Sequence, residues 1–321
     1  MLKFIALGLG VLLVAWIGLG LAIEAAFAPK SLRGEMVNLG DRRLRLVCEG
    51  PETGPLVWLE AGAFGFSADF ADLQATLARE GFRACAYDRA GLGFSDPGPW
   101  PRDSEAIVSD LDQLMTQAGV TRPAILVGHS MGGQHVRLFA VRHPERVAGV
   151  VLLDAATPEA VEIPMVWRFV ATFGRLSQGV ALLTSAGLAK PLFFLGDRIG
   201  LSGPAVREKQ AAFVSGRHAR NAANEAAHWL ESARMTRAAG QLDPAWPVAV
   251  VTAGPSARIR DSAWADARLA PVEASQHGSY AAVSAAGHAT LLSHAHNAEI
   301  VAAVKRVSAS LDQTPANGAA N

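Results

Sequence analysis

One serine occupies a position where its hydroxyl could act as a nucleophile. Residues Gly128-His129-Ser130-Met131-Gly132 match the G-x-S-x-G pattern, after the apolar run Ala124–Val127 and before a helix-like segment. In such an elbow the serine sits on a sharp strand-to-helix turn, and side chains in place of the glycines would clash with neighbouring elements. The turn aims the N-terminus of the following helix at a developing oxyanion. Ser130 is therefore the candidate nucleophile, and the Met131 N–H is a candidate oxyanion donor.

The segments around this elbow alternate between strand and helix patterns. Strands are expected at about 35–39, 43–49, 56–59, 83–87, 124–127, 147–153, 248–252 and 280–284. Helices are expected at about 67–79, 104–118, 131–143 and 298–310, with Ser104 as the N-cap of the second. This alternation predicts an α/β fold in which helices cover both faces of a mostly parallel sheet.

The alternation breaks between Pro158 and Pro244, where only helix-like segments rich in Ala and Leu appear. A segment of this length is too long to be an ordinary loop, so it is expected to be a helical insertion. Its aromatic residues would suit an apolar substrate group, although aromatic residues in a helical insertion more often form core; they include Trp167, Phe169, Phe193 and Phe194.

The composition excludes several classes of site. The chain has 321 residues, and its 29 basic and 29 acidic residues balance, so no electrostatic footprint for nucleic acid is present. Two cysteines are too few for a disulfide scaffold or a four-thiolate zinc site. We expect no cofactor, no metal and no nucleic-acid partner; the oligomeric state stays open.

The first residues are strongly apolar. Phe4–Ile23 contains no charged residue, and about 20 residues at ~1.5 Å each span a hydrocarbon core of ~30 Å. We expect residues 1–28 to be an uncleaved membrane anchor. A cleaved signal segment, with Ala26-Phe27-Ala28 before the cut, and a buried helix are the alternatives. Basic residues flank both ends, so the side of the membrane that carries the rest of the chain stays open.

Three stretches resemble one family. Leu59–Gly62, Ala86–Asp96 and Gly128–Gly133 are similar to bacterial serine hydrolases of the α/β-hydrolase superfamily that carry an N-terminal apolar segment, and the likeness covers roughly 35–311. The resemblance implies an eight-stranded, mostly parallel sheet and a helical cap inserted after the sixth strand. The expected core is 35–156 and 245–311, the cap 157–244, and 312–321 a disordered tail.

The resemblance also implies where the second oxyanion donor and the general base lie. The family's His-Gly-x loop corresponds to Ala61-Gly62-Ala63, so the His is absent, but the donor is a backbone amide. The Ala63 N–H is the nominated donor, with Phe64 as the neighbour that could replace it. Among nine histidines, His288 lies just after the last strand, where the family places its base, whereas His129 is expected to pack or to orient a neighbour.

The acid of the triad has two candidates. The family commonly places it after the seventh strand, but Asp261 is the first carboxylate there and comes late. Asp154 directly follows the buried sixth strand, and burial would demand a partner such as an imidazole. We favour Asp154 and keep Asp261 as the alternative.

The remaining residues of interest are assigned structural roles. Asp88, Arg89 and Asp96 are expected to brace the loop after the fourth strand. Cys48 and Cys85 belong to strands that neighbour each other in this fold. Two free buried thiols are favoured, and a disulfide is the alternative if the domain is exported.

These expectations together predict a serine hydrolase that cleaves small to medium apolar esters, in the manner of a carboxylesterase or lipase. The same triad could serve perhydrolase, C–C hydrolase, amidase or lactonase chemistry, and a binding protein without catalysis is the remote alternative. Serine at the elbow disfavours the dehalogenase and epoxide-hydrolase branches, which use Asp there.

Overall fold

The computed structural model describes residues 1–27, 32–254 and 263–313, and its core is one eight-stranded sheet. The order is β1-β2-β4-β3-β5-β6-β7-β8. Only the pairs β1–β2 and β2–β4 are antiparallel, so the predicted mostly parallel sheet is confirmed. The strands are β1 (Glu35–Asn38), β2 (Arg43–Glu49), β3 (Leu56–Glu60), β4 (Arg83–Tyr87), β5 (Ala124–His129), β6 (Val147–Leu153), β7 (Val248–Ala253) and β8 (Ser279–Val283).

Helices cover both faces of this sheet, because its central strands bury both of their faces. On β3, Val57 and Leu59 pack in a core with the helices at 71–79 and 297–313. Leu56 and Trp58 pack in the core on the opposite face, with the helices at 104–117 and 132–142. The helices are α2 (Ala71–Arg79), which follows η1 (Ser67–Phe70), α3 (Ser104–Gln117), α4 (Gly132–Arg142), which precedes η2 (Pro144–Arg146), α9 (Ala263–Ala274) and α10 (Asn297–Gln313), which follows η6 (Thr290–Leu292) and η7 (His294–His296).

Two helix ends differ from the sequence-based expectation. The N-cap of α3 is Asp103, whose carboxylate accepts the Ala106 N–H at 2.9 Å, so Ser104 is the first helical residue. A carboxylate also interacts favourably with the positive end of the helix dipole. Helix α10 continues to Gln313, into the segment expected to be a disordered tail, and 314–321 lies outside the described residues.

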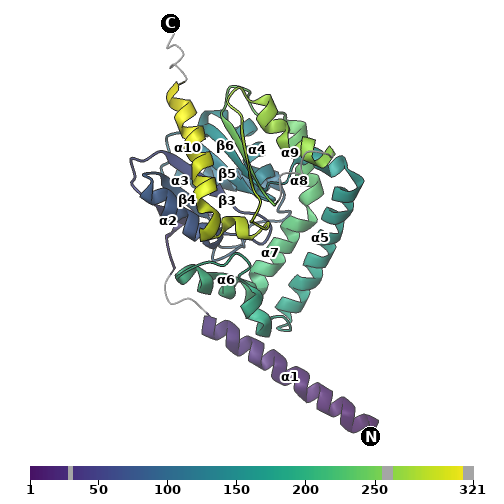
Figure 1. Ribbon diagram of the computed structural model, residues 1–321. Coiled ribbons are helices and arrows are strands. Elements are labelled where there is room, and N and C mark those ends of the chain that lie inside the picture. The colour runs from purple at the N-terminus through teal and green to yellow at the C-terminus, as the bar shows by residue number, and fades with distance from the viewer. Residues whose placement is uncertain (28–31, 255–262, 314–321) are drawn as a thin grey trace.

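A block of helices separates β6 from β7. It contains η3 (Pro158–Glu162), α5 (Pro164–Ser185), η4 (Lys190–Leu195), α6 (Pro204–Val214), α7 (Gly216–Ala227) and α8 (Trp229–Ala239), and the structure describes all of its residues. Helices α5 and α7 pack together, while α8 packs on α3 and α4 of the core. In Figure 1 this block lies beside the sheet, with α5 on its outer side.

The first helix, α1 (Leu2–Phe27), contacts η4 and α6 through its C-terminal half, while its N-terminal half projects away from the rest of the molecule (Figure 1). By length and composition it could cross a membrane, and the same properties are found in signal sequences. Its most apolar stretch is only 6% buried within the protein, so it is not a core helix.

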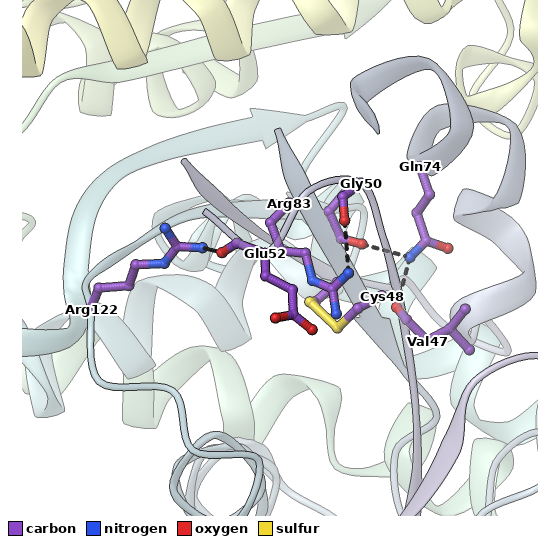
Figure 2. The surroundings of a disulfide bond; sticks show 9 residues. Val47, Cys48, Gly50, Glu52, Gln74, Arg83 and Arg122 are labelled. Atoms are coloured by element: carbon purple, nitrogen blue, oxygen red, sulfur yellow. Dashed lines mark hydrogen bonds between the residues drawn. A yellow bond between two sulfur atoms is a disulfide. The ribbon is translucent and has the colours of Figure 1, made fainter. Parts of the chain in front are cut away.

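A disulfide joins Cys48 and Cys85, which face each other on β2 and β4 (Figure 2). The expectation of two free thiols was therefore wrong, although the two cysteines were placed on neighbouring strands as found. Direct opposition in an antiparallel pair brings the two Cβ atoms close enough to bridge. Nearby, Arg83 donates to the Gly50 carbonyl at 2.8 Å and Gln74 donates to the Val47 carbonyl at 2.7 Å.

Candidate active site

Ser130 lies on a tight turn between β5 and α4. Its φ is 53°, in the left-handed region that residues with a Cβ seldom adopt. Hydrogen bonds fix the turn: the Ser130 N–H donates to the Leu153 carbonyl at 3.1 Å, and the Ser130 carbonyl accepts from Ala156 at 2.7 Å. The conformation is thus held by the end of β6, the adjacent strand.

The glycines around Ser130 are required by close contacts. A Cβ on Gly132 would lie 2.4 Å from the Glu60 carbonyl oxygen, and one on Gly128 would lie 2.7 Å from a methyl of Val136. A Cβ on Gly62 would lie 2.8 Å from the Ser130 Cβ. The elbow therefore packs against the end of β3 at distances that only glycine permits.

The structure brings Ser130, His288 and Asp154 together from the ends of three strands. His288 Nε2 lies 2.9 Å from Ser130 Oγ, and His288 Nδ1 lies 2.5 Å from Asp154 Oδ2. Ser130 is 7% exposed, whereas the His288 side chain is 55% exposed. The site therefore opens toward solvent on the side of His288. Asp261, the alternative acid, lies outside the described residues.

Asp154 has three partners that favour its ionised form. Besides His288, Oδ1 accepts the Ala253 N–H at 3.1 Å and pairs with Arg268 of α9. Burial raises the pKa of the Asp154 carboxyl, but the His288 hydrogen bond and the Arg268 charge outweigh burial and hold the pKa well below its usual range. Sequence reasoning missed Arg268, because 114 residues separate it from Asp154 and no motif marks it.

His129 supports the backbone of the residue that carries the imidazole. Its Nε2–H donates to the His288 carbonyl at 3.0 Å, and the two rings lie 4.9 Å apart. Burial is the main reason that the pKa of His129 falls to about 4, and electrostatic repulsion between the two imidazoles adds to this effect. His129 is therefore neutral near pH 7, and its contacts are those of an orienting residue.

The loop after β3 lies beside the elbow. Phe64 has a φ of 58°, and Ala63 packs with Met131. Within the described residues, neither the Ala63 N–H nor the Met131 N–H donates to an acceptor. Backbone N–H groups without an acceptor are the kind of donor that an oxyanion requires.

Arg89 fixes the backbone of this loop through hydrogen bonds. Its guanidinium donates to the Ala61 carbonyl at 2.7 Å and to the Gly62 carbonyl at 2.9 Å. It also pairs with Glu60 at 2.7 Å and with Glu225 of α7 at 2.8 Å, all of these groups being buried. A single planar cation thus ties the loop to the helical insertion, a contact between distant segments that the sequence did not reveal.

Backbone strain gathers at this site. The only residues other than glycine with left-handed φ in the described chain are Phe64, Ser130 and Asp154. Each such residue costs about 1–3 kcal/mol, and such strain clusters at functional sites. Asp88 braces the loop after β4 by accepting the Phe94 N–H at 2.8 Å, and Asp96 ties this loop to β2 by pairing with Arg43 at 3.1 Å. Among the described residues no cluster of His, Cys, Asp and Glu could hold a metal.

Comparison with known proteins gives one family. The model of the alpha/beta hydrolase fold family matches residues 55–295. The chain is 36% identical over 138 residues to the sn-1-specific diacylglycerol lipase ABHD11 of Mus musculus, covering 42% of this chain and 44% of that one. It is 34% identical over 115 residues to the bifunctional esterase/perhydrolase DCH of Acinetobacter calcoaceticus, covering 35% and 41%. The matches span less than half the length of these curated relatives.

Solved structures share the fold. Cfl2 from Burkholderia cenocepacia superposes with a TM-score of 0.67 over 86% of this chain and 99% of that one, at 21% identity. A putative epoxide hydrolase from Pseudomonas aeruginosa gives 0.65 over 87% and 96%, at 19% identity. Likeness at such identity concerns the fold alone. With a family match across most of its length and this sheet order, the chain belongs to the α/β-hydrolase fold family.

Proposed function

We propose that the chain is a serine hydrolase that cleaves carboxylic esters of small to medium apolar substrates through an acyl-enzyme. The observation that carries this proposal is the hydrogen-bonded series of Ser130, His288 and Asp154, with contacts of 2.9 and 2.5 Å. An imidazole that accepts from a hydroxyl while a carboxylate fixes its other nitrogen activates that hydroxyl as a nucleophile.

The first half of the cycle forms the acyl-enzyme. His288 Nε2 takes the proton of Ser130 as Oγ attacks the ester carbonyl, and Asp154 stabilises the resulting imidazolium. The N–H groups of Met131 and Ala63 donate to the oxyanion of the tetrahedral intermediate. Collapse of the intermediate breaks the ester C–O bond, and His288 protonates the departing alcohol.

The second half regenerates the hydroxyl. Water loses a proton to His288 as it attacks the acyl carbon. The Ser130 Oγ–acyl bond then breaks, His288 returns the proton to Oγ, and the carboxylic acid product leaves. The charge of Asp154 is maintained throughout, which its depressed pKa supports.

The helical insertion, 157–244, is proposed to be a cap that sets substrate choice, with 35–156 and 245–311 as the catalytic core. Val170 of α5 and Trp229 of α8 pack with Met131, the residue after the nucleophile. Side chains of the insertion therefore border the place where the substrate's carbonyl would bind.

We also propose that α1 anchors the protein in a membrane, with a cleaved signal segment as the alternative. In support, α1 is apolar, exposed and long enough to cross a bilayer. The Cys48–Cys85 disulfide favours a location for the folded domain outside the reducing cytosol.

A panel of p-nitrophenyl esters of increasing acyl length tests the proposed reaction. We expect turnover with the highest kcat/KM at short to medium acyl chains, and none with Ser130→Ala beyond the buffer rate. If wild-type protein hydrolyses no ester faster than Ser130→Ala, the ester assignment is wrong.

Perhydrolysis is a second candidate, because one relative is named a bifunctional esterase/perhydrolase. Hydrogen peroxide in place of water would attack the acetyl-enzyme and release peracetic acid. Peracid formation from acetate ester and peroxide that exceeds ester hydrolysis, and that disappears in Ser130→Ala, would favour this reading.

A further inference from the structure

Exposed apolar side chains are concentrated in the helical insertion. After α1, thirteen large apolar residues are exposed in the described chain, and ten of them lie between Met165 and Leu195. Eight of them form what we call the outer apolar surface: Met165, Phe169, Leu176, Val180 and Leu183 of α5 with Leu192, Phe194 and Leu195 of η4. Such a contiguous concentration marks a binding surface. The aromatic residues Trp167, Phe169 and Phe194 thus face outward, contrary to the reading of these residues as core.

Five of the seven exposed apolar residues of α5 form a stripe along one side of the helix. Met165, Phe169, Leu176, Val180 and Leu183 are spaced by four, seven, four and three residues, which places them on one face. The buried face is separate and consists of Val170, Gly174, Ser177, Ala181 and Thr184. The remaining side carries Arg168, Arg175 and Gln178 together with the exposed Trp167 and Leu182. A helix with these three sides resembles those that lie in a membrane interface.

Helix α1 packs against the corner where this surface turns from α5 to η4. The Trp16 indole N–H donates to the Leu188 carbonyl at 2.9 Å, and the rings of Phe27 and Phe193 lie 4.7 Å apart. A Cβ on Gly20 would lie 2.6 Å from the Gly187 carbonyl oxygen, so the two backbones are in close contact there.

This contact fixes the depth of the corner if α1 spans a bilayer. Counted from Ile23, the end of the apolar run, Gly20 lies about 5 Å and Trp16 about 10 Å into the hydrocarbon at 1.5 Å per residue. Their partners Gly187 and Leu188 must lie at a similar level. That range equals the depth, about 5–10 Å, to which interfacial helices bury their apolar face.

The direction of α5 agrees with this depth. In Figure 1, α5 runs across the direction of α1 rather than along it, and its last residue, Ser185, lies next to the corner that α1 contacts. A helix that crosses the axis of a spanning helix lies along the membrane surface. The whole of α5 then lies along the boundary between lipid and water.

We infer that the outer apolar surface docks on the lipid bilayer that α1 spans, with α5 lying in the membrane interface. This docking rests on the proposed anchor and is independent of the proposed reaction, and the lipid bilayer is what covers the surface. The buried side of α5, through Val170, packs with Met131, so the lipid-facing helix also borders the candidate active site.

Labels at four positions test this inference in the full chain, reconstituted into phosphatidylcholine–phosphatidylglycerol vesicles. A fluorophore is attached to a new cysteine in Leu176→Cys, Phe194→Cys, Val11→Cys or Thr121→Cys, the native cysteines being paired. Val11 reports the anchor, and Thr121 is an exposed control that precedes β5, at the end of the sheet opposite Ser130. Quenching by lipids with brominated acyl chains reports contact with the membrane.

We expect the labels at 176 and 194 to lose emission in brominated vesicles to an extent comparable with the label at 11, while 121 is unaffected. Quenching at 11 without quenching at 176 and 194 would overturn the docking but leave the anchor. Absence of quenching at 11, 176 and 194 would overturn both. Energy transfer between labelled copies at 194 without lipid quenching would show that a second copy covers the surface instead. None of these outcomes depends on ester hydrolysis.

Discussion

At the scale of single residues, the proposed activation of Ser130 depends on one carboxylate, Asp154, that fixes the imidazole of His288. Asp154 is the residue that His288 contacts in the structure, and three partners keep it ionised. An imidazole without such a partner adopts the wrong tautomer and cannot accept the serine proton.

Asp154→Asn is therefore expected to lower kcat by about 10³–10⁴-fold, because an amide cannot hold the tautomer that a carboxylate holds. Steady-state ester hydrolysis measures the effect, and circular dichroism checks that the fold is retained. Asp261→Asn is the matched control and should retain wild-type kcat. A large loss in Asp261→Asn with little loss in Asp154→Asn would move the acid to the segment after β7.

Two buried histidines make stability depend on pH. Burial is the main reason that the pKa of His129 falls to about 4 and that of His218 to about 3. Between these values and the ordinary value near 6.5 the unfolded chain binds more protons than the folded one, so the free energy of unfolding falls as pH drops.

The expected slope is at most about 1.4 kcal/mol per pH unit for each histidine, and it is confined to pH below about 6.5. Urea unfolding at about pH 7, 6 and 5 measures it. His218 Nδ1 accepts the Gly93 N–H at 2.9 Å, and the carbonyl of His218→Gln can accept the same bond. The variant should have a shallower slope, and an unchanged slope would contradict the assignment. Asp154 contributes only below about pH 4, its ordinary range.

At the scale of elements, the elbow depends on how closely β3, β5 and α4 approach. Gly132, the first residue of α4, lies against carbonyl oxygens at the end of β3. Backbone atoms at such distances cannot move aside in the way that the end of a side chain can.

Gly132→Ala is expected to lower the free energy of unfolding by about 1–3 kcal/mol and to abolish ester hydrolysis, because the turn must open. Gly179→Ala is its matched control, since Gly179 lies in α5 with no atom within 4 Å of an added Cβ. That change should raise the free energy of unfolding by about 0.5–1 kcal/mol, as for alanine in a helix. Equal effects of the two substitutions on activity would show that the elbow does not need this glycine.

At the scale of the whole molecule, the features that could be predicted from the sequence are those that depend on local residue patterns. The apolar strands and the G-x-S-x-G turn mark the sheet and Ser130, and the position of His288 after the last strand followed from the family resemblance. Helix α9 gave no such signal, because its apolar residues follow no helical stripe and it contains Pro271. Pairs such as Arg89–Glu225, 136 residues apart, depend on tertiary contact and left no trace in sequence spacing.

The disulfide is a second link between distant segments, and its contribution to stability can be measured. Its cysteines are 37 residues apart, and closing a loop of this size stabilises a fold by about 2–4 kcal/mol, chiefly through the unfolded state. The double variant Cys48→Ala/Cys85→Ala should lose about this much free energy of unfolding in urea. Reduced wild-type protein is the control and should match the variant. Identical stability of oxidised wild type and variant would contradict the stabilising role.

The proposed function requires Ser130 to be an activated nucleophile. A fluorophosphonate probe reacts with such a hydroxyl and not with ordinary serines, and peptide mass spectrometry locates the adduct. We predict one adduct per folded chain, on Ser130, absent from Ser130→Ala and formed much more slowly in His288→Ala. Folded wild-type protein that stays unlabelled, or that is labelled at another residue, would contradict the account.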